Sequence, residues 1–169
     1  KPNPPFVYGY SYYGDYYVAP TKEAWTSMAV ANGVDGIDDA MTALVTENKR
    51  MQQYGFTASE YERAKADFMK SIESAYNERN NTENSKYFNA CLDHFLTNEP
   101  MMGIEMEYQL YQQIIPNLPL EAINQFASQL IKNDNLVITL SAPKKDGETL
   151  PTEEELLAMY NNANAMEVE

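Results

Sequence analysis

Residues Glu47–Lys65 read ENKRMQQYGFTASEYERAK, a stretch in which one amphipathic helix ends and another begins. Apolar side chains recur at helical spacing between Val34 and Met51, so one stripe can face a core while the acidic residues between them stay in water. Gly55 suits the position just past a helix end, where a left-handed residue is needed. The sequence therefore predicts a first helix that ends before Gly55.

Thr57 and Glu60 mark the start of a second helix. A threonine followed three residues later by a glutamate is the pattern of a capping box, in which each side chain bonds a free backbone N–H of the other residue. This helix is expected to run from about Ala58 towards Asn77. Its broad apolar face predicts packing against a sheet or several neighbours. That face comprises Tyr61, Ala64, Ala66, Phe68, Met69, Ile72 and Tyr76.

Two strands are expected before this helical hairpin. Aromatic residues alternate with other residues between Phe6 and Tyr12, which is the period of a strand in a sheet with two distinct faces. Gly14-Asp15 is expected to turn or bulge this strand. A second strand is predicted at roughly Ala24–Ala31, and the short connection over residues 20–23 favours antiparallel pairing.

The rest of the chain predicts more helices and one more strand. Helices are expected at about Glu83–Leu96, Met101–Ile115 and Leu120–Ile131, and a capping box of Thr152 and Glu155 begins a last helix. The apolar face of the first of these helices is expected to point towards the core, with Cys91 as a buried thiol. That face comprises Tyr87, Phe88, Cys91, Leu92 and Phe95.

The apolar run Leu136–Leu140 predicts a buried strand, and the polar residues after Tyr160 are expected to fray. The order of these elements predicts an α+β fold, with helices packed on one face of a mostly antiparallel sheet. A chain of 169 residues fits one domain.

Composition narrows the classes of partner. The formal net charge of −13, from 25 acidic and 12 basic side chains, argues against nucleic acid or an anionic membrane as a partner. The sequence has no run of about 20 apolar residues, so no membrane-spanning helix is predicted. Cys91 is the one cysteine and cannot form an internal disulfide, which leaves the compartment open.

Several short motifs, taken in order, resemble the pitrilysin and insulinase family of zinc peptidases. Around the hairpin they are Glu47 and Arg50, then Gly55-Phe56, then Glu60, Arg63, Ala64 and Lys65. Elsewhere they are Pro4-Pro5-Phe6, Trp25–Ala31, His94-Phe95-Leu96, Glu99-Pro100, Ile115–Leu118, Asn135–Thr139 and Pro143. The resemblance covers most of residues 4–160, and its specificity lies in the succession of motifs.

The resemblance implies a non-catalytic domain of the C-terminal type. In these inverzincins an H-x-x-E-H helix and a later glutamate hold zinc, and a catalytic zinc needs three protein ligands. The only histidine here is His94, followed by Phe95, Leu96, Thr97 and Asn98. We therefore expect no catalytic residue and no metal ligand in this chain, assign no substrate-binding residue, and expect zinc in the catalytic domain of the parent protein.

The resemblance also implies a setting for the domain. Residues 1–160 would form a single domain like half of a pitrilysin or mitochondrial processing peptidase, truncated before Lys1, and residues 161–169 a polar tail or a linker to further domains. Its partner would be the catalytic domain of the same chain or a partner subunit, with a peptide substrate enclosed between domains. An extracytoplasmic location, periplasmic or secreted, is expected.

Two other functions remain open on the sequence. The tyrosine-rich first strand is compatible with a stand-alone acidic module that binds peptides or glycans, because aromatic faces stack on sugar rings. Tyrosine is also a favoured strand residue in ordinary packing. A homologue that has lost its metal site and serves as a scaffold is the other alternative.

Overall fold

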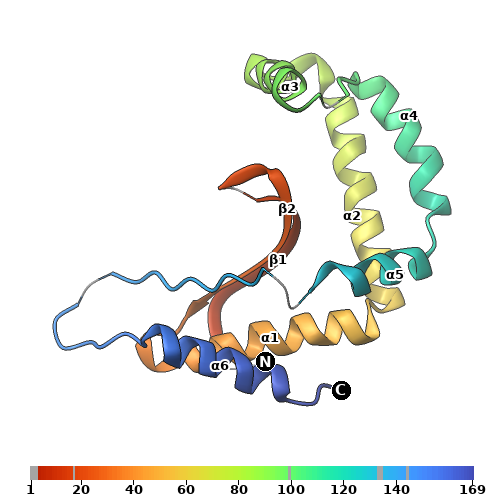
Figure 1. Cartoon of the computed structure of the whole chain (residues 1–169). Coiled ribbons are helices and arrows are strands. Elements are labelled where there is room, and N and C mark those ends of the chain that lie inside the picture. Colours follow the sequence, from red (N-terminus) through yellow and green to blue (C-terminus); the bar gives the residue numbers. More distant parts are fainter. Residues whose placement is uncertain (1–3, 17, 99, 133–134, 144) are drawn as a thin grey trace. The chain divides into compact units, whose positions relative to one another are not determined.

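The computed structural model describes residues 4–16, 18–98, 100–132, 135–143 and 145–169 (Figure 1). Two compact units are present: unit 1 comprises Lys1–Gly55 with Ile123–Glu169, and unit 2 comprises Phe56–Ala122. The α+β class is confirmed. In chain order the elements are β1 (Phe6–Tyr16), β2 (Ala19–Ala31), η1 (Val34–Gly36), α1 (Ile37–Tyr54), α2 (Ala58–Asn77), η2 (Arg79–Asn81), α3 (Asn84–Thr97), α4 (Ile104–Ile114), η3 (Ile115–Asn117), α5 (Leu120–Leu130) and α6 (Glu153–Ala165).

Strands β1 and β2 of unit 1 form an antiparallel hairpin, as predicted. The predicted bulge near Gly14-Asp15 is present as a register shift between Asp15 and Tyr16. The second strand starts earlier than its predicted boundary at Ala24. Residues 20–23 belong to β2 and not to a connecting loop, because pairing continues through Asp15 opposite Glu23.

One face of the hairpin is bonded to α1 through Asn48. The Oδ1 of Asn48 accepts hydrogen bonds from Trp25 Nε1 at 3.2 Å and from Ser27 Oγ at 3.0 Å. Its Nδ2 donates to Ser27 Oγ at 2.8 Å, and Ser27 Oγ lies 2.7 Å from Ser11 Oγ on the paired strand. One amide therefore joins both strands to the helix.

Helix α6 runs alongside α1, and the small residue Ala163 is fully buried (Figure 1). The Nζ of Lys49 donates to the backbone oxygens of Asn164 at 2.9 Å and Met166 at 2.6 Å, where the last carbonyls of α6 lack helical partners.

Tyr54 Oη donates to the carbonyl of Val168 at 2.9 Å, and Arg50 Nε to that of Glu169 at 2.8 Å. Fraying after Tyr160 is therefore a wrong prediction, because α6 continues to Ala165 and side chains of α1 bind the carbonyls beyond it.

The residue after α1 requires glycine. Gly55 has φ +70°, and its N–H donates to the carbonyl of Met51 at 2.8 Å. A side chain at this position would collide with the side chain of Asn124 on α5. The predicted helix end is confirmed, with an extended ψ of −162° in place of the left-handed helical value.

Unit 2 is built on α2, whose bounds match those predicted. The predicted capping box is present: Thr57 N–H donates to Glu60 Oε2 at 2.8 Å, and Glu60 N–H donates to Thr57 Oγ1 at 3.3 Å. The second predicted box, between Thr152 and Glu155, is likewise formed at the start of α6 in unit 1.

Aromatic pairs join α2 to α4. The rings of Phe68 and Tyr111 meet edge to face at 5.1 Å, and those of Tyr76 and Tyr108 stack at 4.5 Å. The guanidinium of Arg79 covers the Tyr76 ring at 4.3 Å. Such pairs add about 0.5–1.5 kcal/mol each to the free energy from area burial.

Helix α3 lies within a residue of its predicted bounds, yet its predicted inward face is exposed. The exposed side chains are Tyr87, Phe88, Cys91, Leu92 and Phe95. Phe95 is 81% exposed, and the Cys91 thiol is not buried. An amphipathic stripe shows that a helix can bury one face, but within the described part of unit 2 no surface covers it.

The predicted strand over Leu136–Leu140 is also wrong. These residues are extended but pair with neither β1 nor β2, and a strand needs a hydrogen-bonded neighbour as well as an apolar sequence. Among the described residues, the sheet consists of the two strands of the hairpin, β1 and β2. The single domain over residues 1–160 stays a prediction.

We predict that Asn48→Ala lowers the free energy of unfolding by about 1–3 kcal/mol, because Trp25 Nε1 and Ser27 Oγ lose their shared partner inside the structure. Urea denaturation followed by Trp25 fluorescence measures the change. Gln53→Ala, at an exposed position on the same helix, is the matched control and should stay within about 0.5 kcal/mol of the parent sequence. Equal stability of the two variants would contradict the role of Asn48.

The start of α2 should loosen in acid. Hydrogen bonds from the backbone N–H and hydroxyl of Thr57 hold the pKa of the Glu60 carboxyl below its ordinary value of 4.5. A lowered pKa gives stability that is complete above pH 4.5 and is lost as the pH falls through the pKa of the folded state. NMR amide shifts of residues 57–61 between pH 6 and pH 2 should follow one titration. Glu60→Gln keeps a capping box and should abolish that titration; an unchanged titration would contradict this assignment.

Candidate functional site

The outward face of the β-hairpin carries a row of tyrosines. Tyr8, Tyr10 and Tyr12 alternate along β1, with ring centroids 5.8 Å and 6.0 Å apart in succession. Their exposed fractions are 58%, 40% and 36%. Directly opposite on β2 lie Val30, Met28 and Thr26, which share this face. These six residues are called the tyrosine face, and Asn48 is bonded to the other side of the hairpin.

The tyrosine face has the chemistry of a recognition surface. Exposed aromatic rings offer flat apolar area while their hydroxyl groups can stay hydrated, which suits a sugar ring or an apolar side chain of a peptide. Exposed Met28 extends the apolar area beside Tyr10. The sequence predicted the alternation of the tyrosines, but the contact between successive rings appears only in the structure.

Tyr13 differs from the other tyrosines of β1 in its partners. Its hydroxyl donates to Glu23 Oε2 at 2.5 Å, and its ring meets Phe126 of α5 edge to face at 5.6 Å. The hydrogen bond to the Glu23 carboxylate raises the pKa of Tyr13 above its ordinary value, with burial and charge repulsion adding to the effect. Tyr13 is therefore a protonated structural contact at neutral pH.

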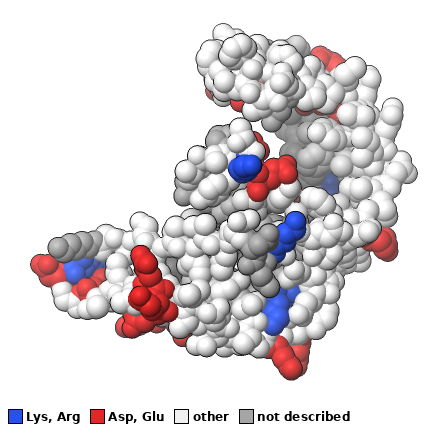
Figure 2. All heavy atoms as spheres, in the orientation of Figure 1, with Lys and Arg blue, Asp and Glu red and all other residues white. Residues whose placement is uncertain are grey.

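Acidic side chains gather over the first turn of α6, as Figure 2 shows. They are Glu153, Glu154 and Glu155. Carboxylates are favoured at a helix start, where backbone N–H groups point outward, and Glu155 bonds the N–H of Thr152 at 2.8 Å. The three glutamates therefore stabilise the start of α6, and their clustering is explained by this structural role.

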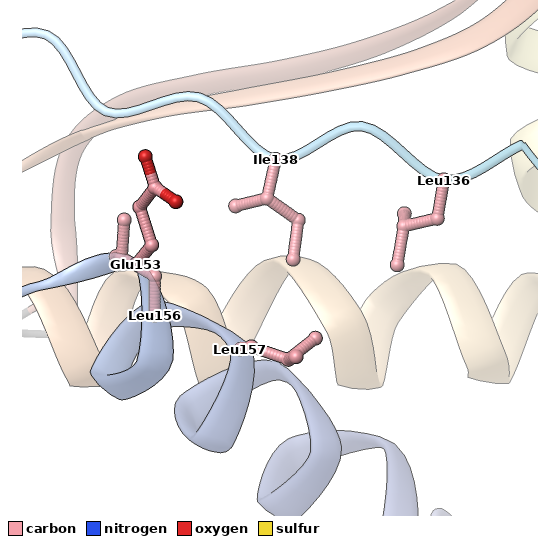
Figure 3. Close-up of a pocket in the computed structure, with 5 residues that line it drawn as sticks. All are labelled: Leu136, Ile138, Glu153, Leu156 and Leu157. Atoms are coloured by element: carbon pink, nitrogen blue, oxygen red, sulfur yellow. The ribbon is translucent and has the colours of Figure 1, made fainter.

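A small cavity lies between α6 and the extended segment that follows α5. Its volume is about 250 Å³, and it is lined by Leu136, Ile138, Glu153, Leu156 and Leu157. Figure 3 shows Leu136 and Ile138 pointing from the extended segment towards α6. Small-molecule sites usually enclose about 300–1,000 Å³, so this cavity is of a size for a single apolar side chain. Sequence reasoning missed it because its two walls are distant in the chain.

Metal-binding groups are scattered on the described surface. His94 and Cys91 are both exposed on α3, and no group of three or more His, Cys, Asp or Glu in the described ranges is placed to hold a metal ion. The sequence assigned no ligand, and the absence of a zinc site stays a prediction.

Comparison with known sequences relates the chain to a zinc protease. No family model matches it. The zinc protease PQQL-like of Arabidopsis thaliana is 32% identical over 95 residues, which are 56% of this chain and 10% of that protein. The matched part of the chain thus spans about a tenth of the length of this relative.

Solved structures share the fold. The first half of the periplasmic protease PqqL from Escherichia coli matches with a TM-score of 0.68 and 17% identity, over 97% of this chain and 35% of that one. A predicted insulinase family protease from Yersinia pestis matches with a TM-score of 0.73 and 16% identity, over 96% and 34%. This chain therefore spans about a third of each of those chains.

The sequence match, the fold and the motifs agree. Glu47 and Arg50, two residues that carry the resemblance, form an ion pair on α1, and Gly55 ends that helix as the motif requires. The match to a zinc protease supplies the sequence relation, and the solved structures supply the fold. The chain is therefore similar in sequence to a zinc protease over 95 residues and has the fold of part of the solved insulinase-family protease structures.

Proposed function

We propose that this chain is a non-catalytic structural and substrate-enclosing domain of a zinc-dependent peptidase. The observation that carries the proposal is the fold, which follows part of the first half of PqqL over 97% of the chain, joined to a sequence match with a zinc protease. Both relatives are longer than this chain, so catalysis would occur in another part of the parent protein.

The composition of the chain supports a non-catalytic role. An inverzincin site takes two histidines from one helix, and His94 is the only histidine here. Zinc bound elsewhere in the parent would polarise the scissile carbonyl and activate water. The residues of this chain would then position the other domains of the parent and form part of the wall of the chamber that holds the peptide.

Large exposed apolar surfaces support a place beside other domains. The buried residues among those described are Ile37, Ala40, Val45, Ala127 and Ala163, and no large side chain is fully buried. Contiguous apolar surface on a protein marks an interaction site. Among the described residues, the apolar side of α3 and the tyrosine face are examples of such surfaces, one in each unit.

An extracytoplasmic location is part of the proposal. The PqqL structure is that of a periplasmic protease, which supports a periplasmic or secreted parent. In the described ranges, none of the helices has the length and apolar character needed to cross a membrane.

A stand-alone binding module is the second candidate, and the exposed tyrosine face favours it. Three aromatic rings in succession, each at least 36% exposed, would suit a glycan or an extended peptide. The third candidate is a scaffold domain in a peptidase homologue that has lost its metal site. The zinc content of the parent protein distinguishes this candidate from a domain of an active peptidase.

We predict that the full-length parent binds one zinc per chain and cleaves an internally quenched peptide. His94→Ala should change neither property, because His94 is exposed on α3 and, among the described residues, belongs to no group of side chains that could hold a metal ion. Elemental analysis and fluorescence measure the two properties. Loss of both in His94→Ala would contradict the non-catalytic role, and a parent without zinc would favour the scaffold.

If the tyrosine face is a recognition site, soluble oligosaccharides or peptides should change the tyrosine and tryptophan fluorescence of the chain to saturation. Tyr10→Ala should abolish the change, because Tyr10 is the middle ring of the row. Tyr87→Ala removes an exposed tyrosine from α3 and is the control. The absence of saturation, or equal binding by both variants, would contradict the binding module.

A further inference from the structure

The turn that joins the hairpin to α1 contains the dipeptide Asn32-Gly33, and both residues are exposed. Gly33 has φ +75° and ψ −176°, a conformation that residues with a side chain rarely adopt, so the fold favours glycine at this position. Asn32 Nδ2 donates to the carbonyl of Pro4 at 3.3 Å, which joins the end of β2 to the residues just before β1. Each residue of the pair therefore has a structural role in the turn.

An asparagine followed by glycine can react with its own backbone, because a glycine nitrogen is not shielded by a side chain. The backbone nitrogen of Gly33 would attack Cγ of Asn32 and lose its proton to solvent, and the side-chain nitrogen would leave as ammonia. Water then opens the resulting five-membered ring by breaking one of its two C–N bonds. Cleavage at Cγ leaves aspartate, and cleavage at the main-chain carbonyl leaves isoaspartate, in which the backbone runs through the side chain.

The surroundings of the pair permit this reaction. A side chain built at Gly33 would meet no atom within 4 Å, so there is room for the ring, and both residues are open to water. Two hydrogen bonds oppose it. The Gly33 N–H donates to the carbonyl of Ala31 at 3.0 Å across only two residues, and the 3.3 Å bond from Asn32 to Pro4 exceeds the usual range of about 2.7–3.2 Å. Such bonds at an exposed turn open readily.

We propose that Asn32 is a site of spontaneous deamidation, with water as the only co-reactant, and that the modification loosens the base of the hairpin. A carboxylate has no N–H to donate to the Pro4 carbonyl, so the bond between the two ends of the hairpin is lost. Isoaspartate also adds one main-chain carbon between β2 and η1. The nearest strand pair is Phe6 opposite Ala31, so the effect falls on the end of the hairpin that leads into the tyrosine face.

Peptide mapping by mass spectrometry tests the modification. The folded 169-residue chain is kept at mildly alkaline pH, and the tryptic peptide of residues 23–49 is followed for the gain in mass when an amide becomes a carboxylate. Fragmentation distinguishes Asn32 from Asn48, which lies in the same peptide but is bonded to Trp25 and Ser27. Asn32 should react several-fold faster than Asn48, and an isoaspartate-specific methyltransferase should label the product.

Asn32→Gln is the matched variant, because attack on its side-chain carbonyl would need a six-membered ring. It should abolish both the gain in mass and the methyl label at this position. A folded chain in which Asn32 reacts no faster than Asn48, or does not react, would overturn the proposal. Methyl label at this position that persists in Asn32→Gln would also overturn it.

Asn32→Asp reproduces the aspartate product and tests the loosening of the hairpin. Backbone amides of residues 6–8 should exchange hydrogen several-fold faster than in the parent sequence, and those of residues 10–12, further along the ladder, should not change. Asn161→Asp adds the same charge at an exposed position on α6 and is the control. Unchanged exchange at residues 6–8 in Asn32→Asp, or an equal effect of Asn161→Asp, would contradict the loosening.

Discussion

Helix α1 is the element on which unit 1 is assembled, because its consecutive residues Asn48, Lys49 and Arg50 bind three different parts of the chain. Asn48 holds both strands of the hairpin, Lys49 binds the last carbonyls of α6, and Arg50 reaches the carbonyl of Glu169. These are polar contacts, and the buried apolar core around them is small. Directed hydrogen bonds from one helix therefore join the other parts of unit 1 to it, while much of the apolar surface of the unit faces outward.

The small buried core and the large exposed apolar surface are consistent with the proposed function. A domain that buries little on its own leaves apolar surface for its neighbours, and the described structure exposes such surface on the tyrosine face, on α3 and along Leu136–Leu140. Solved relatives in which this fold is about a third of the chain have the additional polypeptide that could cover those surfaces. The domain would then position the other domains and enclose the peptide, and catalysis would take place at a metal site elsewhere in the parent protein.

Features set by neighbouring residues could be predicted from the sequence. Gly55 and the capping boxes at Thr57 and Thr152 place helix ends within a few residues, because the groups that satisfy a helix terminus are local. The tyrosine alternation predicted the hairpin for the same reason. Features that need a distant partner could not be predicted. In the described structure Leu136–Leu140 has no paired strand beside it and Cys91 is exposed, whereas residues after Tyr160 are bound by side chains of α1. For the candidate site, the tyrosines and the single histidine could be read from the sequence, but neither the contact between the rings nor the cavity could be predicted.

The measurement that tests the central claim most directly is the sequence of the full-length transcript that encodes this chain. If the chain is the non-catalytic partner of an active peptidase, the translated parent must contain an H-x-x-E-H helix and a later glutamate outside residues 1–169, since those groups form the zinc site. A complete reading frame without them would contradict the account and leave a scaffold or a binding module.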